Sequence, residues 1–428
     1  MYQIIGLVYI ILAIALISGW YKKDGILCLL DFSRVMSLIW MVSIGLYDLA
    51  LSSLLKPDIF INVIVFIIVV CFLLNQRYSE SDARLIKKNI TSINIPKSIP
   101  YWIAILVIIL MVFYSFTMNY ESGTLRLISG SKSYGKSLQL GYIYRLSVLL
   151  CIVFYMTYRL CKNKLHKIIL IILFIVNLYI TITDYSRGPI LFIIINIFIF
   201  EVVNYFVRRK DTSISIKTIV LLLVSISIMI YGFGAIGDSR TDALFGVSAL
   251  DGYKMKYELP RGITWIYIYL ASPMENAKQA LEFMPVDSYT FFANLFYPII
   301  KSVLNIINLG DIFSNWVEYS KEVYPYLWNH AGLNASSFIL DATQDGSLFA
   351  VFVYIFIYIC ISRLAKKVIK SSRITEFTKL IAYGLLFEIP LWSIFVNSAF
   401  KGSADIWILF LTAIVIDYFF IKRDSYEH

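Results

Sequence analysis

The segment WNHAGLNASSFILDATQDGSLFAVFVYIF, residues 328–356, contains the side chains best suited to acid–base chemistry. It holds one of the three histidines of the chain and runs into a long apolar stretch. Because imidazole has an ordinary pKa of about 6.5, His330 can accept a proton near neutral pH and is a candidate general base. The alternative is an interfacial histidine without a catalytic part, since aromatic residues precede it: Tyr324, Tyr326 and Trp328.

Acidic residues form a second candidate group. Asp341 and Asp345 follow His330 and are candidate substrate-binding residues, although capping of the next helix is the simpler explanation for Asp345. Glu388 lies deep within the apolar run LLFEIPLWSIF, where a charged side chain requires a partner or a function. The sequence does not identify that partner.

Four arginines form a third group, suited to binding a phosphate: Arg145, Arg187, Arg240 and Arg261. In TITDYSRGPILF, Ser186 can cap a helix that begins near Pro189, and the amide groups of such a helix start attract anions beside Arg187. Arg145 lies inside an apolar run, where a charge is costly. The alternative is that these arginines snorkel or pair with nearby acids: Asp184, Asp238, Asp242 and Glu258.

Several kinds of chemistry find no support in the sequence. It contains no GxxxxGK[ST] nucleotide loop, no HExxH zinc motif and no DxD pair in the predicted external loop. That loop also lacks cysteine, which excludes a disulfide or a cysteine–metal site there. We therefore expect a reaction without metal or cofactor, driven by something other than ATP.

The elements that must position these residues are membrane helices. The chain is 59% hydrophobic and 15% charged, against about 25% charged in ordinary soluble domains. Because about 20 helical residues cross a bilayer, the apolar runs predict an all-α polytopic membrane protein with about eleven spans. The predicted spans are 2–20, 34–54, 58–75, 101–118, 138–158, 165–183, 189–207, 217–236, 347–362, 377–397 and 404–421.

Basic residues predict the orientation, because cytoplasmic loops concentrate Lys and Arg. Most of them fall in alternate loops, so the amino terminus should face out and the carboxyl terminus in; the loops are 22–34, 77–97, 159–167, 208–217 and 363–379, followed by the tail. The net charge of +10 thus reflects membrane orientation rather than nucleic-acid binding. Three regions result: helices 1–236, a large external loop at 237–346 with short amphipathic helices, and helices with a cytoplasmic tail at 347–428. We interpret 289–309 as an interfacial or re-entrant helix, not a twelfth span.

The layout and two motifs resemble the Wzy-type O-antigen and capsule repeat-unit polymerases and, more distantly, the O-antigen ligases. SRGPILF is similar to an Arg-Gly helix start of the polymerases, and HAGLNASSFILDATQDGSLF is similar to a ligase-type pattern of histidine, asparagine and an acid ahead of a span. The asparagine, Asn334, stands four residues after the histidine, farther than in that pattern. The loop is rich in aromatics, which can stack on sugars.

The resemblance implies a polymerase of the bacterial inner membrane that joins undecaprenyl pyrophosphate-linked oligosaccharides at the outer face. His330 would be the general base, and Arg187 and Arg261 would stabilise the leaving pyrophosphate. Arg145, Arg240, Asn334, Asp341 and Asp345 would bind substrate. The lipid bilayer is a further partner, and the resemblance allows for a chain-length regulator. Two alternatives remain: an O-antigen ligase, and a lipid-linked oligosaccharide flippase that uses Glu388 as a coupling carboxylate.

Overall fold

The computed structural model describes 1–95, 138–183, 187–209, 252–283, 291–296, 337–396 and 404–417, with residues 227, 230, 231, 234, 300 and 335. Within these residues the chain is helical, and one isolated antiparallel bridge joins Ser52 and Met255. The elements are α1 (Tyr2–Asp24), η1 (Gly25–Leu30), α2 (Phe32–Leu49), α3 (Ile59–Tyr78), α4 (Asp82–Asn89), α7 (Leu138–Leu160), α8 (Lys164–Thr183), α9 (Arg187–Arg209), α12 (Arg261–Phe283), α16 (Ser337–Lys370), α17 (Glu376–Trp392) and α18 (Ala404–Ile416).

The prediction of a helical membrane protein is confirmed in its coarse form. By length and apolarity, four helical stretches of the described chain suffice to cross a membrane: Tyr2–Leu30, Phe32–Leu49, Ile59–Asn89 and Ser337–Lys370. Nine of the eleven predicted spans coincide with a helix, namely α1, α2, α3, α7, α8, α9, α16, α17 and α18. The other two, 101–118 and 217–236, fall wholly or largely outside the described residues, so eleven spans stay a prediction.

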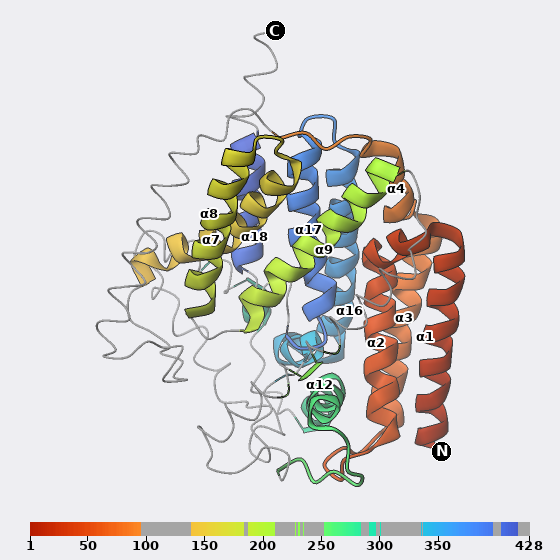
Figure 1. Ribbon diagram of the computed structural model, residues 1–428. Coiled ribbons are helices and arrows are strands. Elements are labelled where there is room, and N and C mark those ends of the chain that lie inside the picture. The colour runs from red at the N-terminus through yellow and green to blue at the C-terminus, as the bar shows by residue number, and fades with distance from the viewer. Residues whose placement is uncertain are drawn as a thin grey trace, which may run out of the picture.

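Most helices run along one common direction, and α12 crosses it (Figure 1). Helices α1, α2 and α3 lie side by side, α16 and α17 pack next to them, and α7 and α8 form a pair farther along. Helix α12 lies across the lower end of this bundle in Figure 1, where it contacts α2 and α16. The two ends of the bundle therefore differ in construction.

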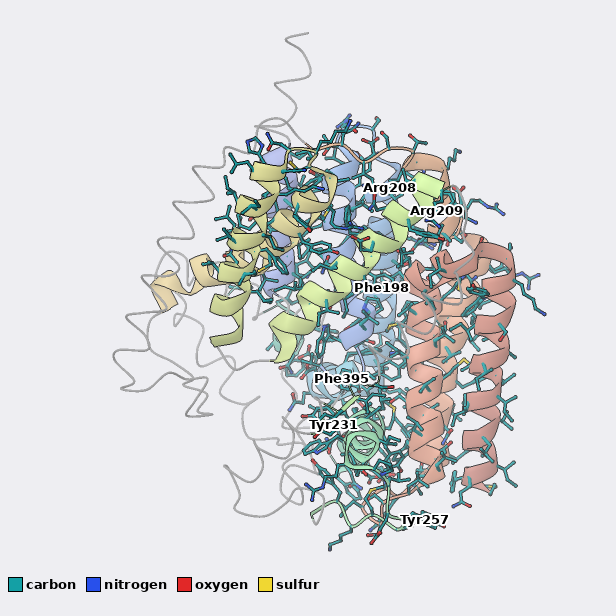
Figure 2. All side chains as sticks on the ribbon, in the orientation of Figure 1. Phe198, Arg208, Arg209, Tyr231, Tyr257 and Phe395 are labelled. Atoms are coloured by element: carbon teal, nitrogen blue, oxygen red, sulfur yellow. The ribbon has the colours of Figure 1, made fainter. Side chains whose placement is uncertain are left out.

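We call the upper end in Figure 1 the basic end. It comprises η1, α4, and the last turns of α9 and α16. Arg208 and Arg209, in the last turn of α9, lie at this end (Figure 2), and α9 contacts η1. Lys366 Nζ lies 3.7 Å from Asp82 Oδ1, and Lys370 Nζ lies 3.4 Å from Glu80 Oε2, so the basic last turns of α16 lie against α4 and the residues just before it.

We call the opposite end the α12 end. It comprises α12, the connection 50–58 between α2 and α3, residues 291–296, and the first part of α16, 337–345. Residues 291–296 contact α16 here, and Ala335 contacts α12. Residues 291–296 and Ala335 thus lie at the same end, and the prediction for 289–309 falls largely outside the described residues.

Local signals explain where the helices begin and end. The carboxylate of Asp31 accepts from the backbone N–H of Arg34 and caps α2, and Asp58 caps α3 in the same way. Helix α2 ends at Leu49 because Ala50 adopts a left-handed conformation, with φ 48°. The predicted span 34–54 therefore extended too far, because Leu54 and its neighbours are apolar but belong to the connection.

Helix α16 is broken at its second turn from the α12 end. Gly346 and Ser347 have non-helical backbone angles, so a short helix, 337–345, precedes the longer membrane helix. The predicted span 347–362 begins at this break but is too short, since the helix continues to Lys370. The short helix is buried, and with α12 it shares one hydrophobic core with the spans; Phe338, Trp265 and Ile268 all belong to it.

Candidate functional site

Helix α12 is joined to the α2–α3 connection by one buried carboxylate. Glu275 has no exposed surface, and its Oε2 accepts from Tyr47 Oη and from the backbone N–H of Lys56, both at 2.8 Å. Its Oε1 accepts from Gln279 Nε2 and forms an ion pair with Lys278 Nζ, both again at 2.8 Å. Four donors around one carboxylate satisfy its lone pairs, so burial is tolerated here. We call Glu275, Lys278 and Tyr47 the α12 clamp.

Residues of α12 also hydrogen-bond to the backbone of the α2–α3 connection. Lys278 Nζ donates to the carbonyl of Lys56 at 2.9 Å, so that residue is held at both its N–H and its C=O. Tyr267 Oη accepts from the backbone N–H of Leu51 at 2.7 Å, and burial raises the pKa of the Tyr267 phenol above its ordinary value. Ser43 donates to the carbonyl of Leu270. Helix α12 and the connection therefore form one unit.

The amino-terminal end of α12 carries the predicted Arg261. Its side chain is exposed at the first position of the helix. The next residue, Gly262, lies against the chain at 230–234, because a Cβ added there would stand 2.6 Å from the carbonyl oxygen of Ile230. The contact is equally tight from the other side, because a Cβ added to Gly234 would stand 2.9 Å from the Cα of Gly262. Two glycines thus let a segment that ends six residues before Arg240 touch the helix that begins with Arg261.

A residue in the second half of α12 hydrogen-bonds to Ala335, which follows the candidate histidine in the sequence. Asn276 is fully buried, and its Nδ2 donates to the carbonyl of Ala335 at 2.6 Å. Ala335 comes one residue after Asn334 and five residues after His330. Those two candidates lie outside the described residues, but the chain next to them is anchored to α12.

The predicted carboxylates lie in the short helix 337–345, which reaches α12 and residues 291–296. Asp345 is 1% exposed; its Oδ1 accepts from the backbone N–H of Asn294 at 2.9 Å, and its Oδ2 accepts from Tyr354 Oη at 2.6 Å. Its carbonyl accepts from the N–H of Phe292, and Asn294 Nδ2 donates to Gln344. Asp345 therefore organises a folded-back segment. Asp341, one turn earlier, is 2% exposed.

The remaining predicted residues are only partly described. Arg187 is the first residue of α9 and Arg145 lies in the first third of α7, while their side chains lie outside the described part, as does all of Arg240. The structure therefore brings Arg261, Asp341 and Asp345 to one end of the bundle.

Glu388 has partners that the sequence did not reveal. It is fully buried on α17, where its Oε1 accepts from Asn196 Nδ2 of α9 at 3.2 Å and its Oε2 from Trp392 Nε1 at 3.0 Å. Gly384, one turn earlier, leaves room for Asn196, whose Oδ1 would stand 2.0 Å from a Cβ at that position. Glu388 thus links α17 to the helix that starts with Arg187.

Sequence reasoning missed Glu275, Asn276 and Lys278. The stretch SPMENAKQ contains a proline and two charges and lies in a region predicted as an external loop, so nothing suggested burial. One signal was present: Glu275 and Lys278 stand three residues apart, which suits an ion pair on a helix. Among the described residues, no group of three or more His, Cys, Asp or Glu forms a metal site.

Fold and site together define a helical membrane protein whose bundle is crossed at one end by a buried, polar helix. Comparison of the chain with protein-family models, curated proteins and solved structures finds no match.

Proposed function

We propose that the protein is a polysaccharide polymerase that joins lipid pyrophosphate-linked oligosaccharide repeat units at the α12 end of the bundle. The acceptor hydroxyl oxygen would attack the anomeric carbon of the growing glycan, and the bond from that carbon to the pyrophosphate oxygen would break. The proton would pass to His330, and the pyrophosphate would leave with its lipid. In this proposal the basic end faces the cytoplasm of a bacterial inner membrane.

One observation supports this proposal most directly: segments that carry the candidate residues meet on α12. Arg261 begins α12, Asn276 holds Ala335 near its middle, and Asp345 holds residues 291–296 beside it. The proposal assigns His330, which stands five residues before Ala335 in the sequence, to the same end.

The charge distribution suits a departing diphosphate. Arg261 is exposed at the first position of α12, and in the proposal its guanidinium binds the pyrophosphate at the membrane surface. The neighbouring carboxylates, by contrast, are buried and hydrogen-bonded: Glu275 within the clamp and Asp345 with Asn294 and Tyr354. Because these acids accept from protein donors, they do not need to face the anion. In the proposal Asp341 and Asp345 serve the substrate by holding the segments around it.

A lipid-linked oligosaccharide transporter is a second candidate, and Glu388 is the observation that favours it. A carboxyl group buried between α9 and α17, with an amide and an indole as its hydrogen-bond partners, is the kind of group that a proton-coupled carrier uses. An O-antigen ligase is a third candidate, which differs from a polymerase only in the acceptor.

The test is incubation of the purified protein with lipid pyrophosphate-linked repeat units and no other component. We expect a ladder of glycans that differ by one repeat unit, together with released lipid pyrophosphate. His330→Ala should remove the ladder without loss of folded protein, and Arg261→Ala should weaken it strongly, with partial recovery in Arg261→Lys. A suitable control is Arg84→Ala at the basic end.

A different pattern would contradict the proposal. Purified protein that moves the lipid-linked unit across vesicles without joining units, and loses this activity in Glu388→Gln, would support the transporter. A single transfer to a lipid A core acceptor, without a ladder, would support the ligase.

A further inference from the structure

A buried carboxyl group and a buried amide meet between α2 and α3. Asp48 has no exposed surface, and Asn62 is 4% exposed. Asn62 Nδ2 donates to Asp48 Oδ1 at 3.0 Å and to the carbonyl of Asp58 at 2.9 Å. Among the described residues, neither Asp48 Oδ2 nor Asn62 Oδ1 has a hydrogen-bond partner. Two acceptor oxygens therefore remain on a pair of groups that one hydrogen bond already joins.

Helix α1 covers this pair closely. A Cβ added to Gly6 of α1 would stand 3.0 Å from Asp48 Cβ and 2.6 Å from the carbonyl oxygen of Gly45. Because small residues let two helix backbones approach each other, α1 shields the last turn of α2 from solvent. A charge in such a place is far more costly than a neutral polar group.

The α12 clamp shows what a buried carboxylate requires in this protein. Glu275 has four donors around it: Tyr47, the N–H of Lys56, Gln279 and Lys278. Asp48, the residue after Tyr47, accepts within the described residues from one side-chain donor, Asn62. Because a buried carboxylate with so little support is costly, such a group becomes neutral by taking up a proton.

A second carboxyl–amide pair lies between α17 and α9. Asn196 Nδ2 donates to Glu388 Oε1, and within the described residues Asn196 Oδ1 has no hydrogen-bond partner. The other oxygen of Glu388 accepts from Trp392 Nε1, so this carboxyl group has two donors. Asp48 has one fewer donor than Glu388 and is therefore the stronger candidate for a bound proton.

We propose that Asp48 and Asn62 form a proton-binding site between α2 and α3. The carboxylate takes up one proton from water, and the resulting O–H donates from Asp48 Oδ2 to Asn62 Oδ1. A carboxylic acid and a primary amide pair in this way because each supplies one donor and one acceptor. One proton thus satisfies both remaining oxygens, and its release weakens the α2–α3 contact beside the clamp residue Tyr47. The site goes beyond the proposed polymerase activity and does not rest on it.

A metal ion suits these oxygens less well than a proton. Ca²⁺ takes roughly six to eight oxygen ligands. Asp48 and Asn62 offer two oxygens without partners, and no group of three or more His, Cys, Asp or Glu in the described part of the chain forms a metal site.

Other titratable groups surround Asp48. Tyr9 faces it from α1, since the Tyr9 Cβ lies 3.4 Å from a Cβ added to Gly45. Asp58 stands at the start of α3, and Glu275 of α12, paired with Lys278, reaches the neighbouring Tyr47. A comparison of variants that differ only at Asp48 isolates its contribution from theirs.

The first test is the thermal midpoint of the purified protein from about pH 5 to 8, with and without Asp48→Asn. The new amide supplies the donor of the neutral acid, so the pair is kept. In the unfolded chain Asp48 loses its proton near pH 3.9, whereas the folded protein keeps the proton to higher pH. The unsubstituted protein should therefore lose stability relative to Asp48→Asn as the pH rises, until the folded protein also releases the proton. We expect the gap to widen by roughly 2 °C for each pH unit over that range.

Two control variants accompany this test. Asp31→Asn changes a fully buried aspartate whose two oxygens accept from the N–H groups of Arg34 and Asp82, so it should lower the midpoint. Asp58→Asn keeps the cap of α3, because asparagine caps as well as aspartate, and should show no advantage that grows with pH. If Asp48→Asn does not accumulate in membranes, Asp48→Ala gives the same pH slope, which depends on the proton and not on side-chain size. A gap that is flat with pH, or an equal slope in Asp58→Asn, overturns the proposal.

The second test observes the proton directly. Infrared difference spectra of the purified protein at about pH 5 and 8 report the carbonyl stretch of protonated carboxyl groups. We expect a band in the unsubstituted protein that is absent in Asp48→Asn and present in Asp31→Asn. The same spectra in both Asp48→Asn and the unsubstituted protein would overturn the proposal, as would a water molecule in place of the proton, which leaves the stability gap flat and gives no such band.

Discussion

The two ends of the bundle bury charge in different ways. At the basic end, Arg34 Nη2 lies 2.7 Å from Asp24 Oδ2, and Asp82 accepts from the N–H of Phe32 and from Tyr383 Oη. These residues join α1, α2, α4 and α17, and helices α2, α4 and α17 begin with side-chain caps. At the α12 end, the buried Glu275 joins a crossing helix to a connection without regular structure.

Backbone strain separates the ends more sharply. Within the described residues, the non-glycine residues with positive φ lie in the α12 end or directly beside it: Ala50, Phe291, Phe292 and Ser337 lie within it, Lys254 accepts from the N–H of Ser53 in the connection, and Ser347 follows the short helix 337–345. At the basic end the one positive φ is at Gly25, where it costs little. Such residues persist only where the surrounding structure holds them, and they cluster at binding and catalytic sites. The difference supports the proposal that the α12 end carries the function, whereas buried ion pairs stabilise the basic end.

The largest expected effect on stability is at the basic end. Asp82→Ala removes the acceptor of the Phe32 N–H and the buried negative charge beside Lys366, although Lys366 keeps Ser79 Oγ and Tyr383 keeps the carbonyl of Leu30; the loss of this buried ion pair should cost about 3–5 kcal/mol. The measurement is the thermal midpoint of the purified protein, with transfer activity normalised to folded protein. The normalised activity should not change.

The control for this variant is Glu80→Ala. Glu80 pairs with Lys370, whose side chain is 52% exposed, so its removal should cost at most about 1 kcal/mol. Equal losses of stability in Asp82→Ala and Glu80→Ala would contradict the view that buried charge holds the basic end together.

A smaller loss of stability and a larger loss of activity are expected at the α12 clamp. Glu275→Gln places an N–H₂ group among donors, so at least one of Tyr47, Lys56 and Lys278 loses its acceptor, at about 1–3 kcal/mol. Activity per folded molecule should fall as well, unlike that of Asp82→Ala. Unchanged activity per folded molecule would mean that the two ends do not differ in function.

Midway between the ends, Gly384→Ala tests the packing of α9 on α17. The added methyl group would overlap Asn196 Oδ1, and such overpacking costs about 1–3 kcal/mol. Asn196→Ser shortens the side chain that is in the way, so the double variant should be more stable than Gly384→Ala alone. Chemical unfolding of the single and double variants measures this, and additive losses would show that the two residues do not meet.

The smallest effect on stability is expected at Ala50, where a substitution can relieve backbone strain. Ala50 ends α2 with a left-handed φ of 48°, which glycine adopts without cost. Ala50→Gly should therefore raise stability by up to about 1 kcal/mol, as measured by the thermal midpoint. A fall in stability would show that the methyl group of Ala50 contributes more through packing than it costs in strain.

Nine of the predicted spans coincide with a described helix, because each is a local apolar run about as long as a bilayer is thick. The sequence predicted the α12 end poorly because burial there depends on distant partners. Glu275 is satisfied by Tyr47 and Lys56, more than two hundred residues earlier, and Glu388 by Asn196, 192 residues away. A periodic sequence pattern reports only on neighbouring residues, so it does not reveal hydrogen-bond partners this far apart in the chain. The position of Asp345 was predicted, but not that it binds the backbone of Asn294.

The most direct test of the account supplies substrate to one side of the membrane at a time. The purified protein is reconstituted in sealed vesicles, and its orientation is established by proteolysis of an epitope placed after residue 428. Lipid pyrophosphate-linked repeat units are then added from outside. The account predicts a glycan ladder in vesicles that expose the α12 end and none in vesicles that expose the basic end. A ladder formed from the basic end, or from neither, would contradict it.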